Sequence, residues 1–560
     1  MLNEITGCLE KGFELGVRWT DENGVLNDAY ESNRPENFAP ACWAVVGASL
    51  YRLTGEDVYL DWTDRWMKRT AGIMEGARNS PGFREYVMGY GVMVFPILSD
   101  VVDREILERW GADLTASYTD DAGLSDCHVS AASLLCDLFL DDGREEKARK
   151  RSGEFIAAFN RRLTSGGYLR DDDVNGHSVA HVYLTGTFLA AVLLNSESDF
   201  SRLSDDDRRQ IRQLLETMCT WLKKANGQFH LPFLASRSIY QMYVYPMVAL
   251  LSYIGEGEAA RERILALLAF CQSFNPDKGV FSHTPNHLSP FALAGLEWTY
   301  NRLNTDLGAG LVAWALLALL IDQKWPGFDP VAATPVEDVV DTEAGYAILH
   351  GGKSRVALAL CNHDWGYHLP LQPLSVKLGN TPMIEPIVDA KRDGVKHAFY
   401  QQVAEPDKAD PLQEPYFGIL VSEAGGAYRI MEGNAEVLAP DEYRLTGPLS
   451  LNLKLDLENE LIRLTYRATD LKDDDQAIFS LPILLWDGKE ELTYSIDNGT
   501  MVLGWSGAAY RISITGNSGP WDLHMARYLH AGYGVTANMT IPVSRGSSQL
   551  HTRVTIERTA

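Results

Sequence analysis

The chain has 560 residues, of which 46% are hydrophobic and 22% are charged, and its formal net charge is −25. This length predicts at least two domains, each with enough residues for a hydrophobic core. The negative charge argues against nucleic acid and anionic membranes as partners, because both bind basic surfaces. It is compatible with a weakly charged sugar acid bound in a locally basic cleft.

The N-terminal residues 1–16 contain neither a basic start nor an apolar stretch, so no signal peptide is predicted. The seven cysteines are scattered and form no CxxC pair, which favours thiols in a reducing compartment. We therefore expect a cytoplasmic protein if the sequence is complete, and a periplasmic or secreted one if a signal peptide was removed. The longest apolar run, residues 307–321, is too short for a typical membrane span and predicts a buried core helix.

Residues 1–322 are predicted to be helical, because long apolar stretches such as FAPACWAVVGASLYRLTG repeat with helical spacing. A glycine-containing turn, a short polar stretch and a long apolar helix recur about every 40 to 60 residues, enough for a helical hairpin each. The turn glycines are Gly24, Gly82, Gly123, Gly167, Gly227 and Gly279. Six hairpins in a closed ring would form an (α/α)6 toroid whose polar stretches meet at one rim; an irregular helical solenoid is the alternative.

Residues 323–341 are rich in proline and lack a helical period, which predicts a linker. From residue 342 to residue 560 the hydrophobic period changes to two, as in LSLNLKLDL at 449–457. This alternation predicts a C-terminal antiparallel β-sandwich, so the fold class is α+β with two domains.

The polar stretches at the predicted rim contain histidine, tyrosine and asparagine, where a solvated loop more often carries lysine and glutamate. These residue types favour proton transfer and oxyanion stabilisation, and aromatic side chains suit sugar faces. The candidate site residues are Trp43, Arg84, Glu85, His128, Asn175, His177, Arg237, Tyr240, Tyr243, His283 and His287.

Several of these residues have a structural alternative. Asn175 and His177 could simply cap the following helix. His177 and His181 are one helical turn apart, as metal ligands can be, but no third ligand motif accompanies them. At least one of the tyrosines in YQMYVYP is expected in the core, because all of them cannot face one cavity.

The order of these features resembles the heparinase II/III-like polysaccharide lyases. VNGHSVAHVYL, with Asn175 and His177, is similar to the Asn-His element of that family, and NGQFHLPFLASRSIYQMY, with Tyr240, to its tyrosine helix start. In the β-domain, EAGYAILHGG (343–352) and HLPLQPLSVKLG (368–379) resemble two further motifs. His368 matches the first histidine of the last motif, whereas Pro370 and Gln372 replace its other metal-site residues.

The resemblance implies a carbon-oxygen lyase that cleaves uronic-acid-containing oligo- or polysaccharides by β-elimination. Asn175 and His177 would hold the carboxylate, with Arg237 as a charge partner, and Tyr240 would act as acid or as both acid and base. His368 would serve as base or cleft wall. No cofactor is required for this reaction, and a divalent metal in the β-domain is a further expectation, with His363 and Asp364 as substitute ligands.

Two other functions stay open from the sequence. A glycoside hydrolase on the same toroid would need two carboxylates, and Glu85 and Asp126 head adjacent hairpins. A non-catalytic glycan-binding protein would use the same aromatic and polar residues without turnover.

Overall fold

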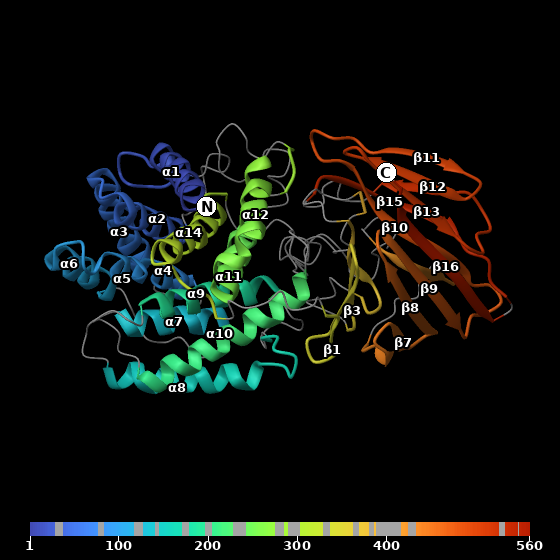
Figure 1. The fold of residues 1–560 in the computed structure, drawn as a ribbon, viewed down its shortest axis with the longest axis horizontal. Helices are drawn as coiled ribbons and strands as arrows, with labels where there is room; N and C mark the ends of the chain where they lie inside the picture. The colour runs from blue at the N-terminus through green and yellow to red at the C-terminus, as the bar shows by residue number, and fades with distance from the viewer. Residues whose placement is uncertain are drawn as a thin grey trace.

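The computed structural model places a helical part and a β-part at opposite ends of an elongated molecule (Figure 1). The structure describes residues 1–27, 37–76, 83–116, 127–139, 145–170, 179–195, 204–227, 242–274, 285–288, 303–328, 337–361, 369–379, 386–387, 416–423, 433–525, 533–546 and 548–559.

The helical part is a ring of helical hairpins, each with an outer and an inner helix. Among the described residues the outer helices are α1 (Leu2–Trp19), α3 (Asp57–Gly76), α6 (Arg104–Thr115), α8 (Glu145–Arg162), α10 (Asp205–Asn226) and α12 (Arg261–Ser273, after the short η1, Gly257–Ala260). The inner helices are α2 (Ala39–Thr54), α4 (Phe83–Val92, extended by α5, Val94–Leu98), α7 (Cys127–Phe139), α9 (Val179–Asn195), α11 (Val244–Glu256) and α14 (Leu303–Asp322). Each inner helix packs on the next, and α14 packs on α2, so the ring closes. The predicted (α/α)6 toroid is confirmed.

The two kinds of helix differ in sequence because they differ in surroundings. Inner helices are apolar on all sides: in α2 every residue from Ala39 to Leu50 is buried. Outer helices bury one stripe, as in α1, whose buried residues follow helical spacing. Helix α14 is long and apolar enough to cross a membrane by composition, but 94% of that stretch is buried inside the protein, as expected of a core helix.

Ring closure depends on the packing of Trp43 in α2. Its ring fills the space beside Gly16 of α1, where a Cβ would lie 2.3 Å from it, and its Nε1 donates to Asn304 O of α14 at 3.3 Å. Trp43 has no exposed surface. Trp43 is a predicted substrate-binding residue, but here its enclosed ring joins three helices, and its contact with a glycan remains a prediction.

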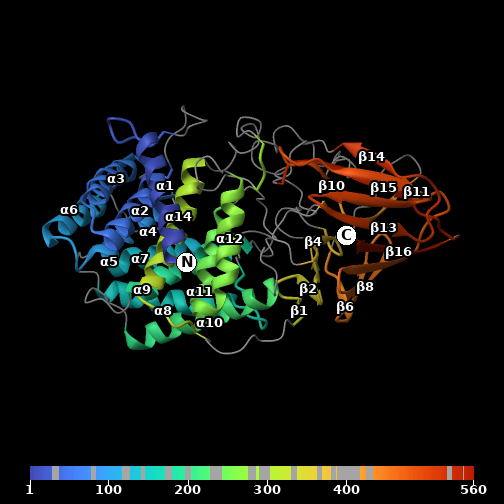
Figure 2. The same cartoon turned by 45° about the horizontal axis from the view of Figure 1, so that its top comes forward.

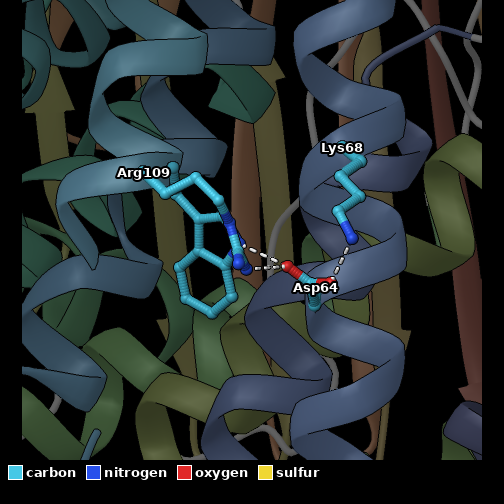
Figure 3. A network of polar contacts seen from close by, with 4 residues as sticks. Asp64, Lys68 and Arg109 are labelled. Carbon is cyan, nitrogen blue, oxygen red and sulfur yellow. Dashed lines mark hydrogen bonds and ion pairs between the residues drawn. The ribbon is translucent and has the colours of Figure 1, made fainter. Parts of the chain in front are cut away.

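A polar contact links neighbouring outer helices on the wall of the ring. Asp64 of α3 accepts hydrogen bonds from Arg109 Nη2 at 2.6 Å and Trp110 Nε1 at 2.8 Å of α6, and Lys68 Nζ lies 2.6 Å from its other oxygen (Figure 3). Burial acts to raise the pKa of Asp64, but the hydrogen bonds and charges of these neighbours hold it below its ordinary value.

The β-part consists of antiparallel sheets. In the described residues one sheet has the order β1 (Val339–Asp341), β2 (Tyr346–Gly351), β3 (Ser354–Ala359), β4 (Pro373–Leu378). A second has the order β14 (Asp522–Met525), β15 (Val535–Pro542), β10 (Gln476–Trp486), β5 (Gly418–Ser422). The largest has the order β11 (Thr493–Asp497), β12 (Thr500–Trp505), β13 (Ala508–Ile514), β16 (Gln549–Arg558), β9 (Leu461–Thr469), β8 (Ser450–Glu458), β7 (Glu442–Thr446), β6 (Glu436–Ala439).

The second and the largest sheet pack face to face, as a sandwich requires. Phe479 of β10 contacts the ring of Tyr466 of β9 at 6.2 Å between centroids. The predicted strand 449–457 corresponds to β8, in which buried and more exposed residues alternate. The antiparallel β-sandwich predicted from the period of two is confirmed.

The connection between the two parts is shorter than the predicted linker. The last helix ends at Asp322, and Trp325 Nε1 then donates to Ile254 O at 3.1 Å, so the first linker residues pack on the helical ring. Strand β1 begins at Val339, three residues before the boundary expected at 342. The last three residues of the predicted linker therefore form strand β1. Asp341 pairs with Tyr346 in the sheet and accepts a hydrogen bond from Thr164 of the ring, and the proline-rich sequence before it does not reveal these contacts.

Candidate functional site

The rim at which the inner helices begin faces the β-part. Two connections from an outer helix to the next inner helix contact it, the one after α8 and the one after α12, and so does the last residue of α10. Figure 2 shows strands β1 and β2 beside the C-terminal end of α10. The rim ends of α8, α10 and α12 therefore lie on the side of the ring that contacts the β-part.

The connection after α8 is fixed to β1 by two acidic residues. Thr164 Oγ1 donates to Asp341 at 2.6 Å, and the Ser165 backbone N–H donates to Glu343 at 2.7 Å. Next to them, Tyr168 and Tyr346 meet edge to face with centroids 5.9 Å apart. This turn contains the predicted glycine Gly167, whose φ of 95° favours a residue without a side chain.

The end of α10 is held by a buried arginine of the sheet. Arg355 Nη1 of β3 donates to Asn226 O at 3.3 Å, and Arg355 has no exposed surface. On the surface above it, Lys224 Nζ lies 3.2 Å from Glu337. The ring and the sheet are thus joined directly before the connection from α10 to α11.

The connection after α12 brings His287, a predicted site residue, to the third contact. Its backbone N–H donates to Asp487 O at 2.6 Å, in the turn after β10. Burial lowers the pKa of the His287 imidazole, while the carboxylate of Asp487 acts in the opposite direction. The imidazole is therefore neutral at neutral pH and retains a nitrogen that can accept a proton.

Beneath the rim, polar side chains of α2, α4 and α14 lie close to Tyr243, the residue before α11, and we call this group the floor of the ring. Burial raises the pKa of Tyr90 well above its ordinary value, and neighbouring groups that carry negative charge when ionised add to the effect. These neighbours are Cys42, Tyr243, Tyr86 and Asp306. The centre of the ring is thus a nearly dry environment in which charges interact strongly.

Two predicted binding residues, Arg84 and Tyr243, lie at the starts of inner helices, and Tyr243 belongs to the floor. Arg84 lies in the first turn of α4 and is 2% exposed, and Tyr243 directly precedes α11 and is 7% exposed. Both are at the rim end of an inner helix, as predicted, but both side chains are almost enclosed. Their contact with a glycan remains a prediction.

The other predicted site residues fall largely on residues that the structure does not describe. Glu85 and His128 lie in the first turns of α4 and α7, and their side chains are outside the description. The remaining predictions lie outside the described residues altogether: Asn175, His177, Arg237, Tyr240, His283 and His368. The same holds for Asp126 of the hydrolase alternative and for the possible metal ligands His363 and Asp364.

Within the described ranges, no group of three or more His, Cys, Asp or Glu side chains is arranged to hold a metal ion. Two residues were not predicted from the sequence: Arg355, which lies at the domain contact, and Asp306, which lies in the floor. The sequence could have indicated Asp306, because it is one of the polar residues that open the apolar helix in LNTDLGAGLVAW (303–314). Arg355 had no such signal, since KSRVALAL reads as an ordinary strand.

No protein-family model matches the sequence, and no curated protein is similar to it in sequence. The fold is nevertheless shared with solved polysaccharide lyases. The chondroitin AC lyase of Streptomyces coelicolor A3, in complex with chondroitin sulphate, matches with a TM-score of 0.51 at 10% identity, over 100% of this chain and 79% of that one. A Paenibacillus xanthan lyase matches with a TM-score of 0.50 at 8% identity, over 100% of this chain and 57% of that one. The chain has the toroid-plus-sheet fold of these polysaccharide lyases, as the sequence resemblance predicted.

Proposed function

We propose that the protein is a lyase that cleaves uronic-acid-containing oligo- or polysaccharides by β-elimination. The observation that carries this proposal is the fold: the whole chain, ring and sheets together, follows that of a chondroitin AC lyase. The position of the β-part over the rim supports it further, because residues from both parts then surround one site.

The reaction needs three groups. A base removes the proton at C5, and the electron pair forms a double bond between C5 and C4 while the bond from C4 to O4 breaks. An acid then protonates O4, the leaving oxygen. The C5 proton becomes acidic only when the neighbouring carboxylate is neutralised by hydrogen bonds or positive charge.

The ring itself favours such an anion, although the whole chain is acidic. The inner helices begin at the rim, so the positive ends of their dipoles are directed toward it. Arg84 adds a positive charge in the first turn of α4. A uronate carboxylate at the rim would therefore meet a locally positive environment despite the net charge of −25.

In this proposal Asn175 and His177 hold the carboxylate, with Arg237 as a charge partner. Tyr240 protonates O4, and Arg237, three residues before it in the sequence, would lower the tyrosine pKa from its ordinary value of about 10, so that the same residue could also act as base. His368 supplies a second candidate base from the β-part. No step is routed through a metal, whose proposed ligands His363, Asp364 and His368 lie outside the described residues.

The test is the ultraviolet absorbance of the unsaturated product during incubation with a panel of uronic-acid polysaccharides and their oligomers. We expect Tyr240→Phe to lower kcat about 10²- to 10⁴-fold, the usual contribution of a general acid or base. We expect His177→Ala to lower kcat about 10²- to 10³-fold, the usual cost of losing one hydrogen-bond donor to a developing negative charge. Tyr494→Phe is the matched control, because Tyr494 lies on the β11 strand and is 49% exposed; it should leave turnover unchanged.

Other results would point to the two alternatives. New reducing ends without the ultraviolet signal, lost in Glu85→Gln and Asp126→Asn, would contradict the lyase and favour a glycoside hydrolase. A wild-type protein that binds a glycan without turnover, and a Tyr240→Phe variant that retains this binding, would favour a non-catalytic binding protein.

A further inference from the structure

Arg355 is a buried charge at the contact between the ring and the sheets. It lies on β3, in which every residue is buried, and none of its surface is exposed. Burying a guanidinium is costly unless hydrogen bonds compensate for the lost water. One such bond is donated by Nη1 to Asn226 O, across the domain boundary.

Asn226 in turn joins this arginine to an inner helix. A hydrogen bond connects the Asn226 side chain with the hydroxyl of Tyr183 in α9, and the charge of Arg355 also acts on Tyr183. Tyr183 is fully buried, and burial raises its pKa. One residue, Asn226, thus links α9, α10 and β3.

His350 is a third neighbour of the guanidinium, and it carries no charge at neutral pH. His350 is paired with Arg355 across β2 and β3, and its pKa is lowered to about 4, first by burial and then by the positive charge of Arg355. At neutral pH the imidazole is therefore uncharged, and on the other side of Arg355 its cross-strand partner is Lys377 of β4.

The position of this contact gives it significance for the proposed reaction. Asn226 ends α10, directly before the connection that contains Arg237 and Tyr240, and α9 begins four residues before Tyr183, directly after the stretch with Asn175 and His177. Arg355 and Asn226 thus hold the start of α9, which follows one of these stretches, and the end of α10, which precedes the other.

We infer that Arg355 is a positioning residue: through Asn226 and Tyr183 it holds the start of α9 and the end of α10 in a fixed relation to the β-part. It does not contact the glycan, because it is fully buried. The catalytic part of this inference rests on the proposed lyase function, whereas the mechanical part does not.

The mechanical part is tested by hydrogen–deuterium exchange in full-length variants. In Arg355→Met we expect faster exchange in the first turns of α9 and the last turn of α10 than in the wild type. Arg463→Met is the matched control, because Arg463 forms ion pairs with Asp456 and Glu458 on the surface of the largest sheet, and it should leave these helix ends unchanged. If the Arg355→Met variant exchanged at the wild-type rate at both helix ends, the inference would be overturned.

The catalytic part is tested with the same variants in the lyase assay. Displacing catalytic groups by a fraction of their working distance lowers kcat, so we expect a loss of about 10- to 100-fold in Arg355→Met with KM little changed, and partial recovery in Arg355→Lys. A wild-type kcat in Arg355→Met would refute the positioning role. If the wild type showed no turnover, the proposed function would fail, and the exchange comparison would still decide the mechanical part.

If Arg355→Met does not fold, Tyr183→Phe provides the decisive variant. It removes only the hydroxyl bound to Asn226 and retains the guanidinium. Faster exchange at the end of α10 supports the link through Asn226, and unchanged exchange there contradicts it.

Discussion

The outer wall of the ring and its contact with the β-part use the same kinds of polar group in different surroundings. On the wall, Asp64 binds Arg109 and Trp110, and its side chain and that of Arg109 are 24% and 49% exposed. At the domain contact, Arg355 and Asn226 are 129 residues apart in sequence and almost wholly enclosed.

This difference predicts where the protein tolerates change. Water can replace a lost partner on the wall, so exposed ion pairs contribute little to stability. It cannot reach the domain contact, where an unsatisfied group retains its full desolvation penalty. Substitutions at the domain contact should therefore be the more damaging.

The largest effect is expected for Gly488→Ala, in the turn that receives His287. Gly488 has a φ of 99°, and an added Cβ would lie 2.4 Å from the carbonyl carbon of His287. Backbone strain and this clash together should lower the free energy of unfolding by about 3 to 4 kcal/mol, measured by urea denaturation.

Gly507→Ala separates strain from clash. Gly507 has a similar φ of 82°, but nothing lies within 4 Å of its added Cβ, so a loss of only about 1 kcal/mol is expected. Equal losses of unfolding free energy in the two variants would show that the backbone at His287 moves away from the added Cβ at little cost.

The second prediction concerns pH and His350, whose pKa of about 4 lies below its ordinary value of 6.5. Between these values the unfolded chain binds a proton that the folded protein excludes, so stability falls as the pH falls from 6.5 to 4. Because the imidazole is largely enclosed, the loss at pH 4 is on the order of 3 kcal/mol.

The contribution of His350 is isolated by comparing the wild type with His350→Gln, which cannot take up the proton. Urea denaturation at several pH values should show a shallower fall in stability for the variant between pH 6.5 and 4. Parallel curves for the two proteins would contradict the assignment of this loss to His350.

The smallest effect is expected on the outer wall. Asp64→Asn removes the charge that binds Arg109 and Lys68 but retains the shape of the side chain, and it should cost about 1 kcal/mol by urea denaturation. Asp100→Asn is its control, since Asp100 is 64% exposed and forms an ion pair with Arg52; a change below about 0.5 kcal/mol is expected. A loss at Asp64 as large as that at Gly488 would remove the contrast between the wall and the domain contact.

The candidate site was accessible to sequence analysis only in outline. Turns such as that at Gly167 and the rim ends of the inner helices followed from composition and period, and Arg84 and Tyr243 do lie at such ends. Whether a side chain faces a cavity or the core did not follow, because both positions favour large residues. Trp43 illustrates this limit: its aromatic ring suited a sugar, but packing between α1, α2 and α14 enclosed it.

The sequence by itself determined the two kinds of element and their order, because periods of 3.6 and two are local properties of neighbouring residues. It also indicated that six similar hairpins could close into a ring. Only the tertiary structure decided that α14 packs on α2, that Asp341 belongs to the first strand's contact with Thr164, and that Arg355 meets Asn226. The physical reason is that these contacts join residues far apart in the chain, and a buried charge or hydrogen bond is defined by its partner, which no local pattern specifies.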